Sequence, residues 1–110
     1  MSYNIELTDN FKKEAKRLSK KYPSLKKELE DLGLILAENP TTTGTYLGNN
    51  IYKIRLAIKS KGKGKSGGAR VMTQVKVVNQ TVYLFSIFDK TEKDNISDKE
   101  IKELIKEIPV

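Results

Sequence analysis

The chain has 110 residues, enough for one compact domain with a modest core and too few for a two-lobed enzyme. It contains no cysteine and no histidine, which excludes disulfide bonds, thiolate zinc sites, thiol nucleophiles and the usual proton shuttle near neutral pH. The net charge is +7, and eight of the 21 basic residues lie between Glu38 and Asp89, where there is no acidic residue. The middle of the chain therefore favours a focused anionic partner.

We expect one domain over residues 1–110, located in the cytoplasm. The N-terminal stretch lacks the apolar core of a signal peptide, and no run approaches the roughly 18 apolar residues of a membrane span. We expect no contact with a membrane. The residue types present also indicate no cofactor and no metal site.

The N-terminal part predicts a strand followed by two helices. Residues 3–7 alternate apolar and polar side chains, which is the period of a half-buried strand. Apolar side chains then recur at helical spacing over residues 11–22, after the candidate caps Asp9 and Asn10. A leucine stripe continues the helical period over residues 24–39, until a proline stops it. We therefore expect a helical hairpin.

Three further strands are expected after the hairpin. Residues 51–59 alternate apolar side chains with basic ones, so the polar side of this strand is positive. Residues 70–78 alternate as well, and residues 81–88, beyond a short turn, are apolar on both faces, as in a covered central strand. The segment 59–70, which reads KSKGKGKSGGAR, is then a loop between two strands.

The last element is a helix with a complete start signal. Ser97 and Glu100 have the spacing of a capping box, and Ile96 and Ile101 that of a hydrophobic staple. The element order is β-α-α-β-β-β-α. The predicted fold class is α+β, with a small antiparallel β-sheet of about four strands packed against the N-terminal helical hairpin and a short C-terminal helix.

The basic, glycine-rich loop admits several readings. Residues 64–66 read GKS, but the glycine that a phosphate-binding P-loop needs earlier is replaced by Lys59, and a strand follows instead of a helix. The same absence of a helix argues against a dinucleotide fingerprint at Gly62, Gly64 and Gly67. A mobile, solvated hairpin tip is the simplest alternative. Basic residues on the neighbouring strands favour a polyanionic ligand instead.

Two motifs resemble those of a known family. The run IYKIRLAIKSKGKGKSGGARV, followed by VYLFSIFDKTEKDNISDKEIKEL, closely resembles the RelE/ParE superfamily of toxins from bacterial toxin–antitoxin modules, especially its HigB-like branch. In that branch a K-x-R strand leads into a GKGKSGGxR segment, and a later strand ends in a Y-x-K-x-E-type sequence. Residues 51–106 carry the resemblance. Phe88 stands where relatives often have tyrosine, and residues 72–74 replace a stretch that is often rich in aromatic residues.

The resemblance implies helices packed on a small sheet and, for RelE-like members, an endoribonuclease that cleaves messenger RNA in the ribosomal A site. It implies contacts with messenger RNA and with the backbone of the 16S ribosomal RNA. A cognate antitoxin from the same operon would neutralise the toxin. RelE-like members use basic residues rather than a histidine pair, which agrees with the composition of this chain.

Cleavage of RNA without a metal requires deprotonation of the 2′-hydroxyl, stabilisation of the pentavalent phosphate and protonation of the leaving 5′-oxygen. We assign the phosphate to Arg70 and Arg55, because a guanidinium offers fixed paired donors. Proton transfer is assigned jointly to Lys90 and Glu92, without a choice between them. We expect Arg70 and Lys90 on the same side of the molecule, in one cleft. The RNA backbone is expected to bind Lys53, Lys59, Lys61, Lys63, Lys65 and Lys76.

Three other functions stay open at this point. A relative of ParE would poison DNA gyrase and would need no RNA-cleaving centre. A non-catalytic nucleic-acid-binding module would share the positive charge, although the exposed aromatic pattern typical of such modules is missing. An inactive relative would be retained for antitoxin binding or transcriptional control.

Overall fold

The computed structural model describes residues 2–62 and 64–109. It has the expected order of elements, with one additional short strand after the second helix. The helices and longer strands are β1 (Asn4–Leu7), α1 (Asp9–Lys21), α2 (Leu25–Glu38), β3 (Ile51–Leu56), β4 (Ala69–Lys76), β5 (Thr81–Asp89) and α3 (Asp98–Leu104), and the added strand is β2 (Thr45–Tyr46). In the part of the chain that is described, no helix has the length and apolar character needed to cross a membrane.

The strands form one five-stranded sheet in the order β1-β5-β4-β3-β2. Strands β2 to β5 are antiparallel neighbours, whereas β1 runs parallel to β5. The α+β class is confirmed, but the expectation of about four antiparallel strands is wrong in this detail. The parallel pair is possible because β1 and β5 are far apart in the sequence, so no hairpin turn imposes an antiparallel direction on them.

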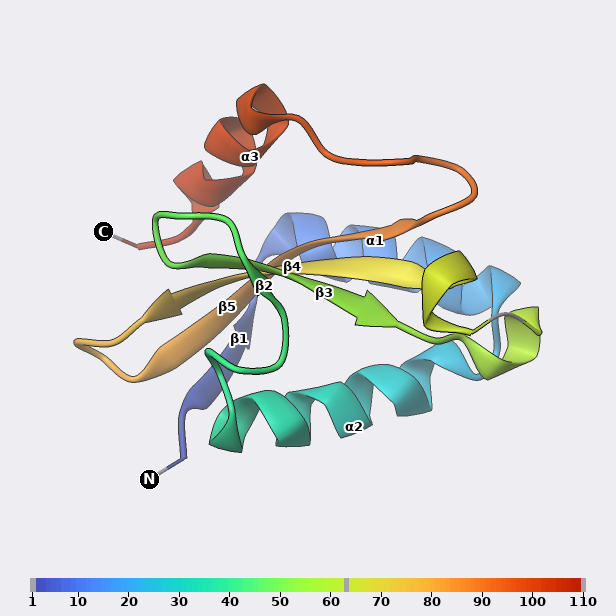
Figure 1. The fold of residues 1–110 in the computed structure, drawn as a ribbon, viewed down its shortest axis with the longest axis horizontal. Coiled ribbons are helices and arrows are strands. Elements are labelled where there is room, and N and C mark those ends of the chain that lie inside the picture. The colour runs from blue at the N-terminus through green and yellow to red at the C-terminus, as the bar shows by residue number, and fades with distance from the viewer. Residues whose placement is uncertain (1, 63, 110) are drawn as a thin grey trace.

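The helical hairpin covers one face of the sheet and α3 covers the other (Figure 1). The larger core lies under the hairpin, where the apolar stripes of α1 and α2 meet one side of the strands. Its fully buried side chains include Leu18, Leu25, Leu36, Val71 and Val82. These are the positions that the two periods predicted, 3.6 in the helices and 2 in the strands.

The cap of α1 differs from the expected one. Thr8 has an extended backbone, and its Oγ1 accepts a hydrogen bond from the amide nitrogen of Phe11 at 3.2 Å. Asp9 and Asn10, which the sequence suggested as caps, lie inside the first turn. The Asn10 side chain instead donates to the carbonyl of Phe85 at 3.0 Å, which links the helix to β5.

The C-terminal helix begins as predicted. Ser97 Oγ accepts from the amide of Glu100 at 3.1 Å, and a Glu100 carboxylate oxygen accepts from the amide of Ser97 at 3.1 Å. This capping box fixes the start of α3 over the second face of the sheet. The smaller core beneath it consists of Ile51, Met72, Phe85, Phe88, Ile96, Ile101 and Ile108.

Candidate functional site

The basic loop between β3 and β4 is folded onto the helical hairpin. It forms two 3₁₀ turns, η1 (Lys59–Lys61) and η2 (Lys65–Gly67). The amide of Lys59 donates to a carboxylate oxygen of Glu28 at 2.8 Å, and the amide of Ser60 donates to Ser24 Oγ at 2.9 Å. The start of the loop is therefore bound to the first turn of α2. A mobile, solvated hairpin tip, the simplest alternative from the sequence, would not make these contacts.

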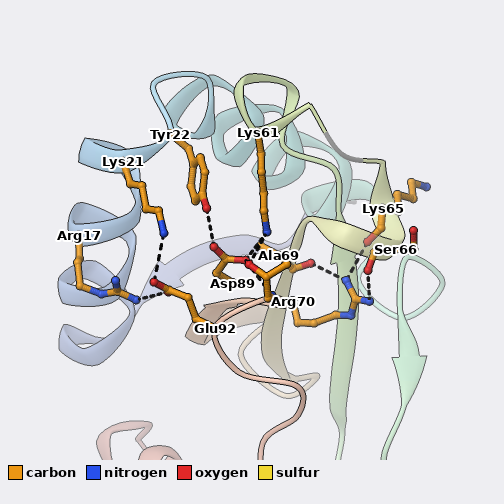
Figure 2. A network of polar contacts seen from close by, with 11 residues as sticks. Arg17, Lys21, Tyr22, Lys61, Lys65, Ser66, Ala69, Arg70, Asp89 and Glu92 are labelled. Carbon is orange, nitrogen blue, oxygen red and sulfur yellow. Dashed lines mark hydrogen bonds and ion pairs between the residues drawn. The ribbon is translucent and has the colours of Figure 1, made fainter.

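Asp89, the last residue of β5, is fully buried beside this loop (Figure 2). Its carboxylate accepts hydrogen bonds from the Tyr22 hydroxyl at 2.7 Å and from the amide and hydroxyl of Thr91 at 3.0 and 2.8 Å. It also forms an ion pair with the Lys61 ammonium, which is itself largely buried. Burial opposes ionisation of Asp89, but these hydrogen bonds outweigh it and hold the pKa of the carboxyl well below its usual range.

Arg70, at the start of β4, is only 5% exposed. Its Nη1 donates to the carbonyls of Lys65 at 2.9 Å and Ala69 at 3.1 Å, and its Nη2 donates to the carbonyl of Ser66 at 3.3 Å. Burial lowers the pKa of this guanidinium, and the neighbouring charge of Arg55 lowers it further. Arg70 thus holds the second half of the basic loop, besides contributing charge to the site.

Four cations gather on the sheet face that α3 covers, and we call Lys53, Arg55, Arg70 and Lys90 the cationic face. Arg55 lies directly opposite Arg70 in the β3–β4 pair, so both side chains leave the same side of the sheet. Lys53 precedes Arg55 by two residues and therefore shares this side. Its ammonium donates to Asn95 Oδ1 at 3.3 Å, in the segment that leads to α3.

Asp94 shows that these cations lie near one another. Lys90 Nζ contacts an Asp94 carboxylate oxygen at 2.6 Å and the Asp94 carbonyl at 2.8 Å. The hydrogen bond from Lys90 lowers the pKa of the Asp94 carboxyl, and the charges of Lys53 and Arg70 lower it further. Charges from β3, β4 and the end of β5 therefore act on one exposed carboxylate. This places Arg70 and Lys90 on the same side of the molecule, as the sequence led us to expect.

Glu92 lies apart from Lys90 and faces α1. One of its oxygens accepts from Arg17 at 2.9 Å, and the other lies 3.4 Å from the Lys21 ammonium, as Figure 2 shows. The hydrogen bond from Arg17 is the main cause that lowers the pKa of the Glu92 carboxyl. The sequence reasoning missed Arg17 and Lys21, whose spacing of four residues on one helix was the available signal.

The remaining lysines predicted to bind RNA occupy different surroundings. Lys59 and Lys65, with Arg55, line a cavity of about 280 Å³ between α2 and β3. Lys61 forms an ion pair with Asp89. Lys76 ends β4, at the far end from Arg70, next to Lys102 and Lys106. Lys63 lies outside the described residues. In the described chain, no group of three acidic side chains is positioned to hold a metal ion.

The sequence matches one known protein family over most of its length. A family model described as the RelE toxin of the RelE/RelB toxin–antitoxin system matches residues 8–108. The chain belongs to the RelE toxin family. The resemblance seen in the sequence is confirmed at this level, and the chain is the toxin component of a toxin–antitoxin system. No curated protein sequence matches it significantly.

Solved structures support the same fold for this RelE-family toxin. A double arginine-to-alanine mutant of E. coli toxin RelE in the free state is 19% identical, with a TM-score of 0.65 over 99% of this chain and 100% of that one. The isolated E. coli RelE toxin is 20% identical, with a TM-score of 0.62 over 98% and 100%. The Mycobacterium tuberculosis RelBE2 toxin–antitoxin complex gives 14% identity and a TM-score of 0.63, over 81% and 99%.

A glycine at the end of the basic loop is required by close packing in this RelE-family toxin. A Cβ on Gly68 would lie 2.0 Å from the carbonyl oxygen of Leu56, whereas no described atom lies within 4 Å of a Cβ on Gly64. We expect Gly68→Ala to lower the free energy of unfolding by about 1–3 kcal/mol, because β3 and β4 must separate to admit the methyl group. Gly64→Ala should change it by less than about 0.5 kcal/mol. Urea unfolding of both variants checks this, and equal stabilities would contradict the close approach.

Proposed function

We propose that this RelE-family toxin is a metal-independent endoribonuclease that cleaves messenger RNA on the ribosome and so inhibits translation. One observation carries the proposal: four cations share one sheet face, and three of them, Lys53, Arg70 and Lys90, act together on the carboxylate of Asp94. A carboxylate is a small anion with oxygen acceptors, as a phosphodiester is, so the same donors suit an RNA backbone. The proposed domain spans residues 1–110.

The roles divide according to exposure and orientation. Arg55 is exposed and so can bind and stabilise the reacting phosphate, while the buried Arg70 supplies charge and fixes the loop. Lys53 and Lys65 hold the RNA backbone. Lys90, on the cationic face, donates a proton to the leaving 5′-oxygen. Glu92 is the remaining candidate to accept the proton of the 2′-hydroxyl, and the two cations of α1 that bind its carboxylate make it a weak base.

The partners follow from the family. We propose a cognate antitoxin encoded in the same operon, by analogy with the toxin–antitoxin complex of RelBE2. Messenger RNA in the ribosomal A site and the backbone of the 16S ribosomal RNA are the proposed nucleic-acid contacts, in the cytoplasm. The GKGKSGGAR segment, residues 62–70, supports placement in the HigB-like branch.

The test uses the purified toxin with ribosomes programmed with a defined message. We expect cuts in the message only when ribosomes are present, and growth arrest when the wild type is induced in bacteria. Arg55→Gln should lower the cleavage rate about tenfold or more, because a phosphate-stabilising donor is lost. Lys102→Gln, on α3, removes the same charge away from the cationic face and should cleave as the wild type does.

Salt dependence separates phosphate contacts from general charge effects. The logarithm of the affinity for a single-stranded RNA should fall linearly with the logarithm of the salt concentration, and Arg55→Gln should reduce that slope by about 0.7. Loss of DNA supercoiling with intact messages would instead indicate a gyrase inhibitor. RNA binding without cleavage would indicate a binding module and would contradict the enzyme.

A further inference from the structure

We propose that Asp89, with its partners Lys61 and Tyr22, is a positioning unit that holds the basic loop and the end of β5 in the arrangement required for RNA cleavage. The proposal rests on the function proposed above. It gives Lys61 a role different from the RNA contact that its sequence position suggested. The three residues come from three elements: the C-cap of α1, η1 and the end of β5.

The geometry joins both ends of the basic loop to one residue, Asp89. Lys61 lies in the first turn of the loop, and its ammonium contacts Asp89, the Thr91 hydroxyl at 3.0 Å and the Tyr22 ring, with its centroid 5.7 Å away. At the other end of the loop, Ala69 is the register partner of Asp89 in the β4–β5 pair. The beginning of the loop is therefore bound to the Asp89 side chain, as Figure 2 shows, and its end is paired with Asp89 in the sheet.

The same residue connects the loop to the cationic face. Asp89 immediately precedes Lys90, and the amide of Lys90 donates to the carbonyl of Gly68 at 3.0 Å. Gly68 in turn lies two residues before Arg70, whose guanidinium holds the carbonyls of η2. A shift of Asp89 would consequently move Lys90 and the Arg70 contacts together. This is why we assign the unit to positioning and not to direct contact with RNA.

The stability of the fold alone does not explain why a buried ion pair of Lys61 and Asp89 occupies this position. Breaking a buried ion pair is costly, but replacing it with well-packed apolar side chains is often neutral or stabilising. What an apolar pair would not provide is directionality, because Asp89 accepts from donors on α1, on η1 and on its own strand end. Such a network fixes one orientation of the three elements.

Two pairs of variants test the positioning role. Tyr22→Phe removes one donor to Asp89 without changing charge, and its control Tyr52→Phe removes the hydroxyl of another largely buried tyrosine, one for which the described residues supply no hydrogen-bond partner. Lys61→Met removes the ion pair, and its control Lys59→Met removes the same charge from the same turn. Each variant is examined by amide hydrogen exchange and by cleavage kinetics on programmed ribosomes.

We expect exchange of the loop amides to accelerate about 3- to 10-fold in Tyr22→Phe and more in Lys61→Met, while the central amides of β4 and β5 keep their protection. In both variants kcat should fall with little change in KM. Lys59→Met should raise KM at constant kcat, because it loses only attraction for RNA. Tyr52→Phe should match the wild type in exchange and in kinetics.

Each outcome decides the proposal. Unchanged loop exchange in Tyr22→Phe and Lys61→Met overturns it, whether or not the wild type cleaves RNA. Faster loop exchange with unchanged kcat, in a wild type that cleaves, also overturns it. If the wild type does not cleave, the proposed function fails. The positioning role is then tested by the affinity of the free toxin for a single-stranded RNA oligonucleotide. Weaker binding by Tyr22→Phe then supports positioning, and equal binding overturns it.

Discussion

Replacing Arg70 with alanine is expected to lower ribosome-dependent RNA cleavage by about 100- to 1,000-fold, more than Arg55→Gln does, because it removes a charge near the reacting phosphate and also the support of the basic loop. The free energy of unfolding should fall as well, by about 1–3 kcal/mol, because three backbone carbonyls lose their donor. These carbonyls belong to Lys65, Ser66 and Ala69. The variant therefore removes a charge from the cationic face and also releases the loop.

Two further variants separate these effects. Arg70→Lys keeps the charge, but an ammonium lacks the planar fork that reaches several carbonyls at once, so the loop should be loosened while the charge stays. Arg55→Ala removes a charge from the same face and leaves the loop contacts in place. We expect cleavage to fall in both, and stability to fall only in Arg70→Lys. Urea unfolding and the cleavage assay measure the two quantities, and an Arg70→Ala variant with activity within threefold of the wild type would contradict the assignment.

Much of the fold could be predicted because local signals and tertiary packing agree. The leucines of α2 and the apolar side of β4 were visible as periods of 3.6 and 2, and the cores use those positions. The capping box at Ser97 was visible because it depends on two residues three positions apart. Features of this kind need no knowledge of the rest of the chain.

The features that were missed depend on contacts between distant segments. The direction of β1 is set by its pairing with β5, about 75 residues later, and no local turn encodes it. The choice of Thr8 over Asp9 as the cap is set where β1 ends, because the amide of Thr8 donates to the carbonyl of Leu84. Boundaries decided by such long-range bonds cannot be read from periodicity.

The candidate site shows the same division. Alternation placed Lys53 and Arg55 on the polar side of β3, and the register adds Arg70 to that face. Asp89 gave no signal, because a single carboxylate after an apolar run is indistinguishable from a strand end exposed to solvent. Its role appears only when α1 and the basic loop meet it. Glu92 was assigned jointly with Lys90 because both residue types can transfer a proton, and the two side chains diverge in the structure.

Asp89→Asn should produce the largest loss of stability, about 3–5 kcal/mol near pH 7, because it leaves the largely buried Lys61 ammonium without a counter-charge. Combining it with Lys61→Met should recover part of that loss, since the orphaned cation is then removed as well. Asp31→Asn is the matched control: its ion pair with Lys27, at 3.0 Å, is exposed, and little change is expected. Urea unfolding of the wild type, Asp89→Asn, Lys61→Met and the double variant measures the coupling between Asp89 and Lys61.

The pH dependence of stability gives this prediction a second readout. The pKa of Asp89 is depressed in the folded state, so the stabilisation it provides is fully present above the pKa of about 3.9 that an unfolded aspartate has. It is lost as the pH falls below that value toward the folded pKa. The wild type should therefore lose stability more steeply than Asp89→Asn on acidification, and the gap between them should narrow. Parallel curves between about pH 5 and pH 2 would show that the carboxylate of Asp89 gains nothing from its buried partners.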